Sequence, residues 1–193
     1  MPSIFKEFAK RTTLPVHIDE IRDWMIASGA VNRVVFYPLD RDPQYLRGLV
    51  RLDKWRPPES NKEQTVADIP FSTRLSPEEQ RLIKAKELIH IDDPCEARTA
   101  TREQVAELIS EIVIPPELLV DLNKFGAGLI DHTGILAGLG ALVPLAARDQ
   151  LAKLYPNSLS LKRVAELCEI PDTYVPFLLS EKWGKILRKN CAK

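Results

Sequence analysis

The feature that most constrains the fold is a change in hydrophobic pattern at Ser76. Before Ser76, apolar residues recur once with helical spacing and then alternate, which predicts one helix followed by strands. After Ser76 the apolar spacing is helical through the rest of the chain. This pattern predicts an α+β protein with a sheet-bearing N-terminal half and a helical C-terminal lobe. We place the two lobes at residues 1–95 and 96–193, packed together or continuous as one domain.

The N-terminal half is predicted to contain a helix over residues 17–28 and strands over residues 32–38, 45–55 and 66–71. The connections between these strands are too short for parallel crossovers, which favours a small antiparallel sheet. Pro70 has no backbone N–H to donate to a neighbouring strand, so we expect the third strand at an edge of the sheet.

The helical half opens on a strong start signal, Ser76-Pro77-Glu78-Glu79. Ser76 can cap the helix, Pro77 suits its first position, and Glu79 can close a capping box, so this helix is expected to run to about residue 91. Further helices are predicted over residues 102–113, 125–143, 145–154, 161–168 and 172–180. Several glycines within the 125–143 helix predict that it packs closely against the 76–91 helix, and a flexible or broken helix is the alternative interpretation.

Composition excludes some classes of function. Lysine plus arginine and aspartate plus glutamate both number 27, and this balance argues against coating nucleic acid or membrane through bulk charge. Cys95, Cys168 and Cys191 form neither a disulfide framework nor a CxxC zinc pattern, and the N-terminus lacks an apolar signal stretch. A cytoplasmic protein is therefore expected. Asp131 and His132 interrupt the most apolar segment, so we expect no membrane span.

One helix face carries residues suited to chemistry. Lys86, Glu87 and His90 project together from the 76–91 helix, because positions three and four apart are neighbours. The run Lys86-Glu87-Leu88-Ile89-His90 has the spacing of the zinc-peptidase motif H-E-x-x-H, in which two histidines bind zinc and the glutamate activates water. Lys86 stands where the first histidine would be. From these residues alone, a solvated helix face with one polar histidine is the alternative interpretation.

The order of motifs resembles the ImmA/IrrE family of metallopeptidase-like proteins. In that family a helix and a small sheet precede a run of the type R-F-T-x-A-H-E-x-x-H, and Arg81 and Ala85 stand at its Arg and Ala. The family's third metal ligand leads a helix of the type E-x-x-A-N-x-F-A-x-x-L-L-M-P. Residues 131–144 match that helix in length, with Asp131 at the Glu position. Residues 161–171 match a further segment, so the resemblance covers about residues 15–180.

The resemblance implies a zincin-like metallopeptidase core, with Glu87 as general base and His90 and Asp131 as metal ligands. Lys86 replaces the other ligand, and a protonated lysine does not coordinate zinc. We therefore expect no bound cofactor, with the Lys86 ammonium in the metal position and paired with Glu87 or Asp131. The alternative is a rearranged zinc site that recruits His132, Asp92, Asp93 or Cys95.

The resemblance also implies a regulator from a phage, another mobile element or a stress circuit, with a helix–turn–helix repressor or an antitoxin as protein partner. With Lys86 in the motif we expect a pseudoenzyme that binds this partner without cleaving it. Two alternatives stay open: an active zinc peptidase with an altered metal site, and a DNA-binding regulator that uses residues 160–193, with Arg163 and Lys185 as basic contacts. Against DNA binding, the 172–180 helix contains Pro176 and no Arg, Lys, Asn or Gln to contact bases.

Overall fold

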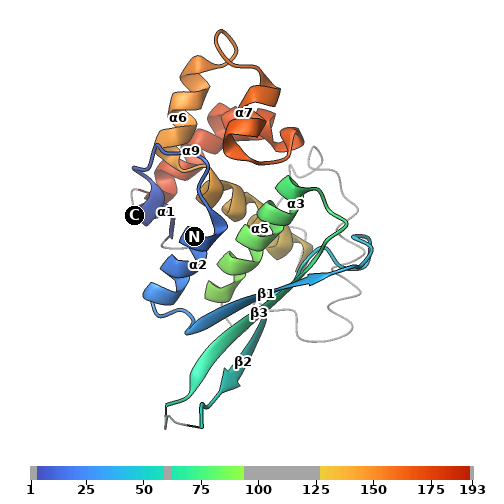
Figure 1. Ribbon diagram of the computed structural model, residues 1–193. Helices are drawn as coiled ribbons and strands as arrows, with labels where there is room; N and C mark the ends of the chain where they lie inside the picture. Colours follow the sequence, from blue (N-terminus) through green and yellow to red (C-terminus); the bar gives the residue numbers. More distant parts are fainter. Residues whose placement is uncertain (1–3, 59–61, 94–126, 192–193) are drawn as a thin grey trace.

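The computed structural model describes residues 4–58, 62–93 and 127–191, with only the helical backbone for residues 127–133. Within these ranges the protein is an α+β structure with a three-stranded sheet (Figure 1). The elements in chain order are α1 (Ile4–Phe8), α2 (Ile18–Ala27), β1 (Arg33–Leu39), β2 (Arg51–Trp55), β3 (Gln64–Ser72), α3 (Pro77–Ile89), the short 3-10 helix η1 (His90–Asp92), α5 (Ala127–Leu142), α6 (Leu145–Leu154), α7 (Leu161–Cys168), the 3-10 helix η4 (Asp172–Tyr174), α8 (Val175–Leu179) and α9 (Glu181–Cys191).

The sheet is mixed, with strand order β1-β3-β2. β1 runs parallel to β3, from Arg33 opposite Val66 to Leu39 opposite Ser72, and β2 pairs with β3 in the antiparallel direction. The prediction of an antiparallel sheet is therefore wrong for β1. The prediction considered the β1–β2 and β2–β3 connections one at a time. The chain between β1 and β3 spans residues 40–63, including β2, and is long enough for the two strands to pair in parallel.

β3 is the central strand, so the edge position predicted from Pro70 is also wrong. The Pro70 carbonyl accepts a hydrogen bond from the Leu49 backbone N–H, 3.2 Å away, which shows that Pro70 turns its polar backbone towards the β2 side. The regular β2 ladder ends earlier, at the pair Arg51–Asp68. Pro70 therefore still pairs with Tyr37 of β1 but lies beyond the β2 ladder, where its missing N–H breaks no hydrogen bond to β2.

Most of the predicted helices are confirmed. α2, α3, α6 and α7 lie where they were expected, and α5 covers most of residues 125–143. The segment 172–180 divides into η4 and α8, while α1 and α9 were not predicted. The helix expected over residues 102–113 lies outside the described residues.

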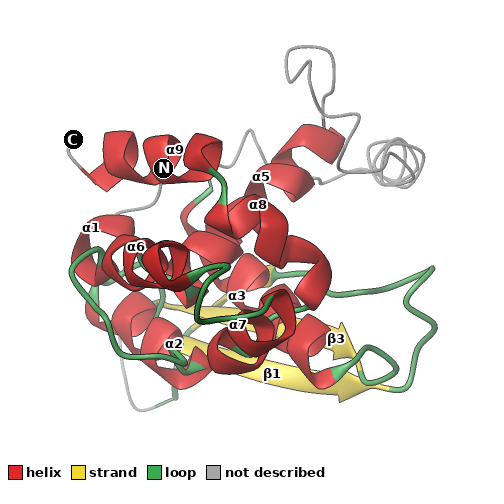
Figure 2. Cartoon of the chain, turned by 90° about the horizontal axis from the view of Figure 1, so that it is seen from above, coloured by secondary structure: helices red, strands yellow, loops and turns green. Residues whose placement is uncertain are grey.

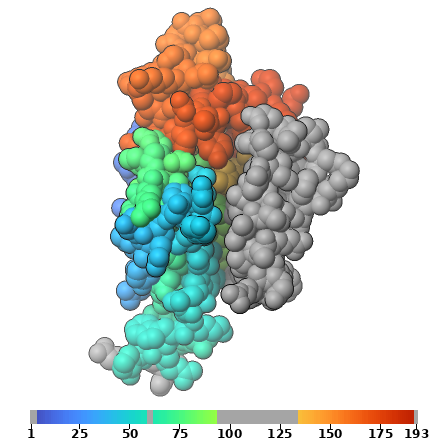
Figure 3. All heavy atoms as spheres, turned by 90° about the vertical axis from the view of Figure 1, so that its right-hand side faces the viewer, coloured from blue at the N-terminus to red at the C-terminus, as the bar shows by residue number. Residues whose placement is uncertain are grey.

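Helices α2 and α3 lie on one face of the sheet, and α5 packs on the other side of α3 (Figure 2). A continuous cluster of buried apolar residues, from Ile4 to Leu187, joins the sheet-bearing half to the helical half. The β2–β3 end of the sheet projects from this body (Figure 3). This arrangement makes α3 the central helix, which explains why nearly all of its residues after Gln80 are buried.

The glycines of α5 allow the close packing that was predicted. A Cβ atom on Gly138 would lie 3.2 Å from the Lys86 backbone nitrogen, and one on Gly134 would lie 3.0 Å from Lys86 Cγ. Both glycines therefore face α3, one helical turn apart. Gly140 faces the opposite way, where a Cβ atom would meet Phe5 and Leu187.

We expect the substitution Gly138→Val to lower the free energy of unfolding by about 1–3 kcal/mol, because the added carbons would push α5 away from the backbone of α3. Urea denaturation followed by circular dichroism measures the change. Lys153→Val is the control, since it places the same branched residue on an exposed position of α6. Equal effects of the two substitutions would contradict close packing at Gly138.

Among the described residues, no single helix has the length and apolar composition needed to cross a membrane. The segments Gly134–Leu142 and Leu145–Leu154 meet that test only when taken together, and they are bent by 77° at the break between them.

Candidate functional site

The candidate site is built on α3, whose start follows the predicted capping box. Ser76 Oγ accepts a hydrogen bond from the Glu79 backbone N–H, and a Glu79 carboxylate oxygen accepts one from the Ser76 N–H. α3 lies between the sheet and α5, so the polar residues in its second half are enclosed. Lys86 is 5% exposed and Glu87 is 3% exposed.

Lys86 and Glu87 form a buried ion pair. The distance between Lys86 Nζ and Glu87 Oε1 is 2.9 Å. That oxygen is fully buried and accepts no well-aligned hydrogen bond within the described residues, so the ammonium beside it is its compensating charge. One of the two pairings named for Lys86 from the sequence is thus present. The Glu87 carboxylate is therefore neutralised by a cation from the same helix, α3.

A glycine ahead of β2 brings the chain against Glu87. A Cβ atom on Gly48 would lie 2.3 Å from Ile83 Cγ2 and 3.4 Å from Glu87 Oε1, so this position requires glycine. Gly48 also forms an isolated antiparallel bridge with Phe71 of β3. The Glu87 carboxylate is therefore enclosed between α3 and the segment leading into β2. Sequence reasoning treated Gly48 only as part of a strand.

His90 lies at the C-terminal end of α3 and is held on two sides. Its Nδ1 atom is hydrogen-bonded to Asp93 Oδ2, and its Nε2 atom is pressed against α5, where a Cβ atom on Gly134 would approach to 2.2 Å. A histidine whose Nδ1–H donates to a carboxylate keeps its lone pair on Nε2, which is the arrangement typical of metal-binding histidines. In this structure that nitrogen meets helix backbone.

The remaining predicted ligands do not complete a metal site within the described residues. Asp131 and His132 belong to α5, but their side chains lie outside the described set, as does all of Cys95. Asp92 and Asp93 are in or next to η1, and burial raises the pKa of Asp92. Where side chains are described, no three His, Cys, Asp or Glu groups come close enough to hold a metal ion.

Arg81 ties three parts of the chain together. Its guanidinium donates to the carbonyl oxygens of Val16 and Cys168 and pairs with the Glu169 carboxylate. Burial lowers the pKa of Arg81, and Glu169 opposes this shift. Arg81 therefore positions α3 against the start of α2 and the end of α7.

The residues of the DNA-binding alternative lie on two helices. Arg163 on α7 is exposed and pairs with Glu166, 2.9 Å away, while Lys185 is exposed on α9. The apolar residues of this segment form a buried core, made of Val164, Ala165, Cys168, Ile170, Val175 and Leu178. The second helix of the pair, α8, has five residues and begins at Val175 with Pro176 in its first turn.

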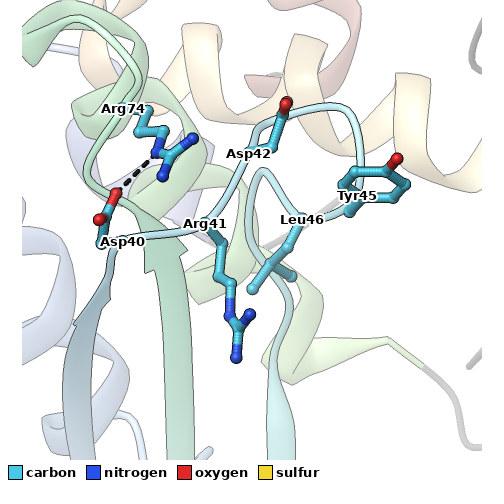
Figure 4. Close-up of a pocket in the computed structure, with 6 residues that line it drawn as sticks. All are labelled: Asp40, Arg41, Asp42, Tyr45, Leu46 and Arg74. Atoms are coloured by element: carbon cyan, nitrogen blue, oxygen red, sulfur yellow. Dashed lines mark hydrogen bonds and ion pairs between the residues drawn. The ribbon is translucent and has the colours of Figure 1, made fainter.

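Two surface hollows lie outside the Lys86–Glu87 pair. The first, of about 520 Å³, is at the C-terminal end of β1, where Arg74 reaches Asp40 and Tyr45 points away from them (Figure 4). The second, of about 430 Å³, lies between the N-terminal turns of α2 and α3 and is lined partly by Lys84. Neither is lined by a site residue predicted from the sequence.

Comparison of the chain with protein-family models, with curated proteins and with solved structures found no match.

Proposed function

We propose that this protein is a metal-free regulator with a metallopeptidase-like core that binds a protein partner without cleaving it. The observation that carries the proposal is the buried ion pair between Lys86 and Glu87. In a zinc peptidase the residue at position 86 would bind the metal, and the adjacent glutamate would activate water. Here position 86 holds an ammonium group at ion-pair distance from that glutamate.

The donor set around Lys86 does not fit a zinc ion. A lysine ammonium has no lone pair to offer, and it repels a dication at short range. The Glu87 carboxylate is enclosed by α3 and Gly48 and is compensated by Lys86, so it is poorly placed to take a proton from water. His90 keeps the carboxylate partner of a metal ligand, Asp93. These features support a peptidase-like core without its metal chemistry.

The class of partner follows from the family resemblance of the sequence. That resemblance favours a helix–turn–helix regulator or an antitoxin as the bound protein. A core stabilised by its own ion pair needs no metal to keep its shape, which suits a protein that acts by binding alone.

Protein purified without a histidine tag, exposed to zinc and then gel-filtered, is expected to retain less than about 0.1 zinc ion per chain by elemental mass spectrometry. Lys86→His places two histidines one turn apart and is expected to retain more zinc than the unmodified protein, provided that His90 Nε2 turns away from Gly134 of α5. Lys182→His, on the exposed surface of α9, is the control for adventitious binding. Stoichiometric zinc in the unmodified protein would contradict the proposal.

A second experiment tests whether the protein binds its partner without cleaving it. After incubation with a helix–turn–helix regulator that forms a complex with this protein in gel filtration, the partner is expected to remain full length on electrophoresis. Cleavage of the partner that disappears in Glu87→Gln would instead identify an active peptidase.

A further inference from the structure

Lys84 is the one residue between Arg81 and Ile89 of α3 that is not buried. Its side chain lines the hollow between the N-terminal turns of α2 and α3, together with Ile18, Phe36 and Gln80. The amine lies over aromatic rings, with Nζ 4.0 Å from the centroid of Phe71 and 5.7 Å from that of Phe36. Lys84 is therefore an amine held in a partly apolar, open hollow.

Among the described residues that line this hollow, the carboxylates lie away from Lys84 Nζ or pair with other side chains. Within the described part of the chain, no carboxylate oxygen lies within 4.0 Å of Lys84 Nζ, and the Glu169 carboxylate is taken by Arg81. From α2, Asp19 favours the protonated amine at longer range, and His17 also lines the hollow. Burial has the larger effect and lowers the pKa of Lys84.

Lys54 provides the opposite case in the same protein. It is exposed on β2, and its Nζ atom lies 2.8 Å from a carboxylate oxygen of Glu63. Hydrogen bonding to Glu63 raises the pKa of Lys54. A larger share of Lys84 than of Lys54 is thus present as the free amine near neutral pH, although Lys54 is the more exposed side chain.

We propose that Lys84 is an acylation site that takes an acyl group from an activated small-molecule donor such as an acyl phosphate. The neutral amine nitrogen attacks the carbonyl carbon, and a C–N bond forms. The C–O bond to phosphate breaks, phosphate leaves with the electron pair, and the amine proton passes to water. The product is a neutral amide, and its acyl group can lie against Ile18 and Phe36 in the hollow. This site is independent of the Lys86–Glu87 pair.

The test uses acetyl phosphate as the probe on the folded full-length protein, with peptide mass spectrometry to measure acetylation of each lysine over time. At about pH 7.5 we expect Lys84 to react severalfold faster than Lys54, because burial lowers the pKa of Lys84 while the hydrogen bond to Glu63 raises the pKa of Lys54. The ratio is expected to fall as the pH rises towards 10, and to approach one in concentrated urea.

Lys84→Arg should remove the signal of the Lys84 peptide and leave acetylation of Lys54 unchanged, which checks the assignment of the peptide. A Lys84 rate equal to or below that of Lys54 in the folded protein would overturn the proposal. A preference for Lys84 that persists in urea would also overturn it, since the local sequence rather than the folded hollow would then be its cause.

Discussion

Replacing Glu87 by glutamine is expected to lower the free energy of unfolding by about 3–5 kcal/mol. Glutamine keeps the shape of the side chain but removes the negative charge that faces the buried Lys86 ammonium. Removing one partner of a buried ion pair is costly because the other charge loses a close opposite charge while it stays out of water. Urea denaturation at neutral pH, followed by circular dichroism and by tryptophan fluorescence, measures the loss.

Glu63→Gln is the matched control for this substitution. It makes the same chemical change in the ion pair between Glu63 and Lys54, which is exposed to solvent. Exposed pairs contribute about 0–1 kcal/mol, so this variant should unfold nearly as the unmodified protein does. If the two variants lost the same free energy, the Lys86–Glu87 pair would not be buried as described.

The double variant Lys86→Met/Glu87→Leu separates lost charge from lost packing. Replacing both members of a buried pair by apolar residues of similar size is often neutral or stabilising. We therefore expect it to recover most of the free energy lost in Glu87→Gln, with the α3–α5 contact intact.

Replacing Arg148 by methionine is expected to lower the free energy of unfolding by about 2–4 kcal/mol. Arg148 on α6 is 2% exposed, and its guanidinium donates to the carbonyl oxygens of Leu178, Leu179 and Ser180 at the end of α8. Methionine fills much of the same space but leaves these acceptors without their donor. The loss is measured by urea denaturation.

Arg163→Met is the comparison for Arg148, because Arg163 is exposed on α7 and its ion pair joins neighbouring turns of one helix. We expect a change below about 0.5 kcal/mol in this variant. A loss at Arg148 no greater than that at Arg163 would show that the carbonyl groups at the end of α8 find other donors.

The helices of this protein could be predicted where local signals were strong. The capping box at Ser76 and Glu79 placed the start of α3, and apolar spacing placed α6 and α7 at their observed bounds. α9 was not predicted because its many basic residues are typical of exposed chain, although Trp183 and Leu187 on its other face are buried.

The strand order and the tertiary contacts of the site could not be predicted from the sequence. The central position of β3 depends on the path of the whole segment 40–63 between β1 and β3. No single turn signal within that segment indicates the strand order. At the site, helical spacing placed Lys86, Glu87 and His90 on one face, but their partners depend on tertiary contacts. Two such tertiary contacts are the approach of Gly48 to Glu87 and the packing of Lys84 over aromatic rings.

The contact between α1 and α9 bears on the order in which the protein folds during synthesis. Phe5 and Leu187 meet at Gly140, and the Cys191 thiol donates to the Phe5 carbonyl oxygen at 3.5 Å. Helix α1 therefore packs against α9, a helix that is synthesised much later. Until α9 emerges from the ribosome, the apolar surface that it covers on α1 and at Gly140 stays exposed, so the nascent chain carries uncovered apolar surface while the residues between α1 and α9 are synthesised. Its yield in a cell then depends on chaperones as well as on final stability.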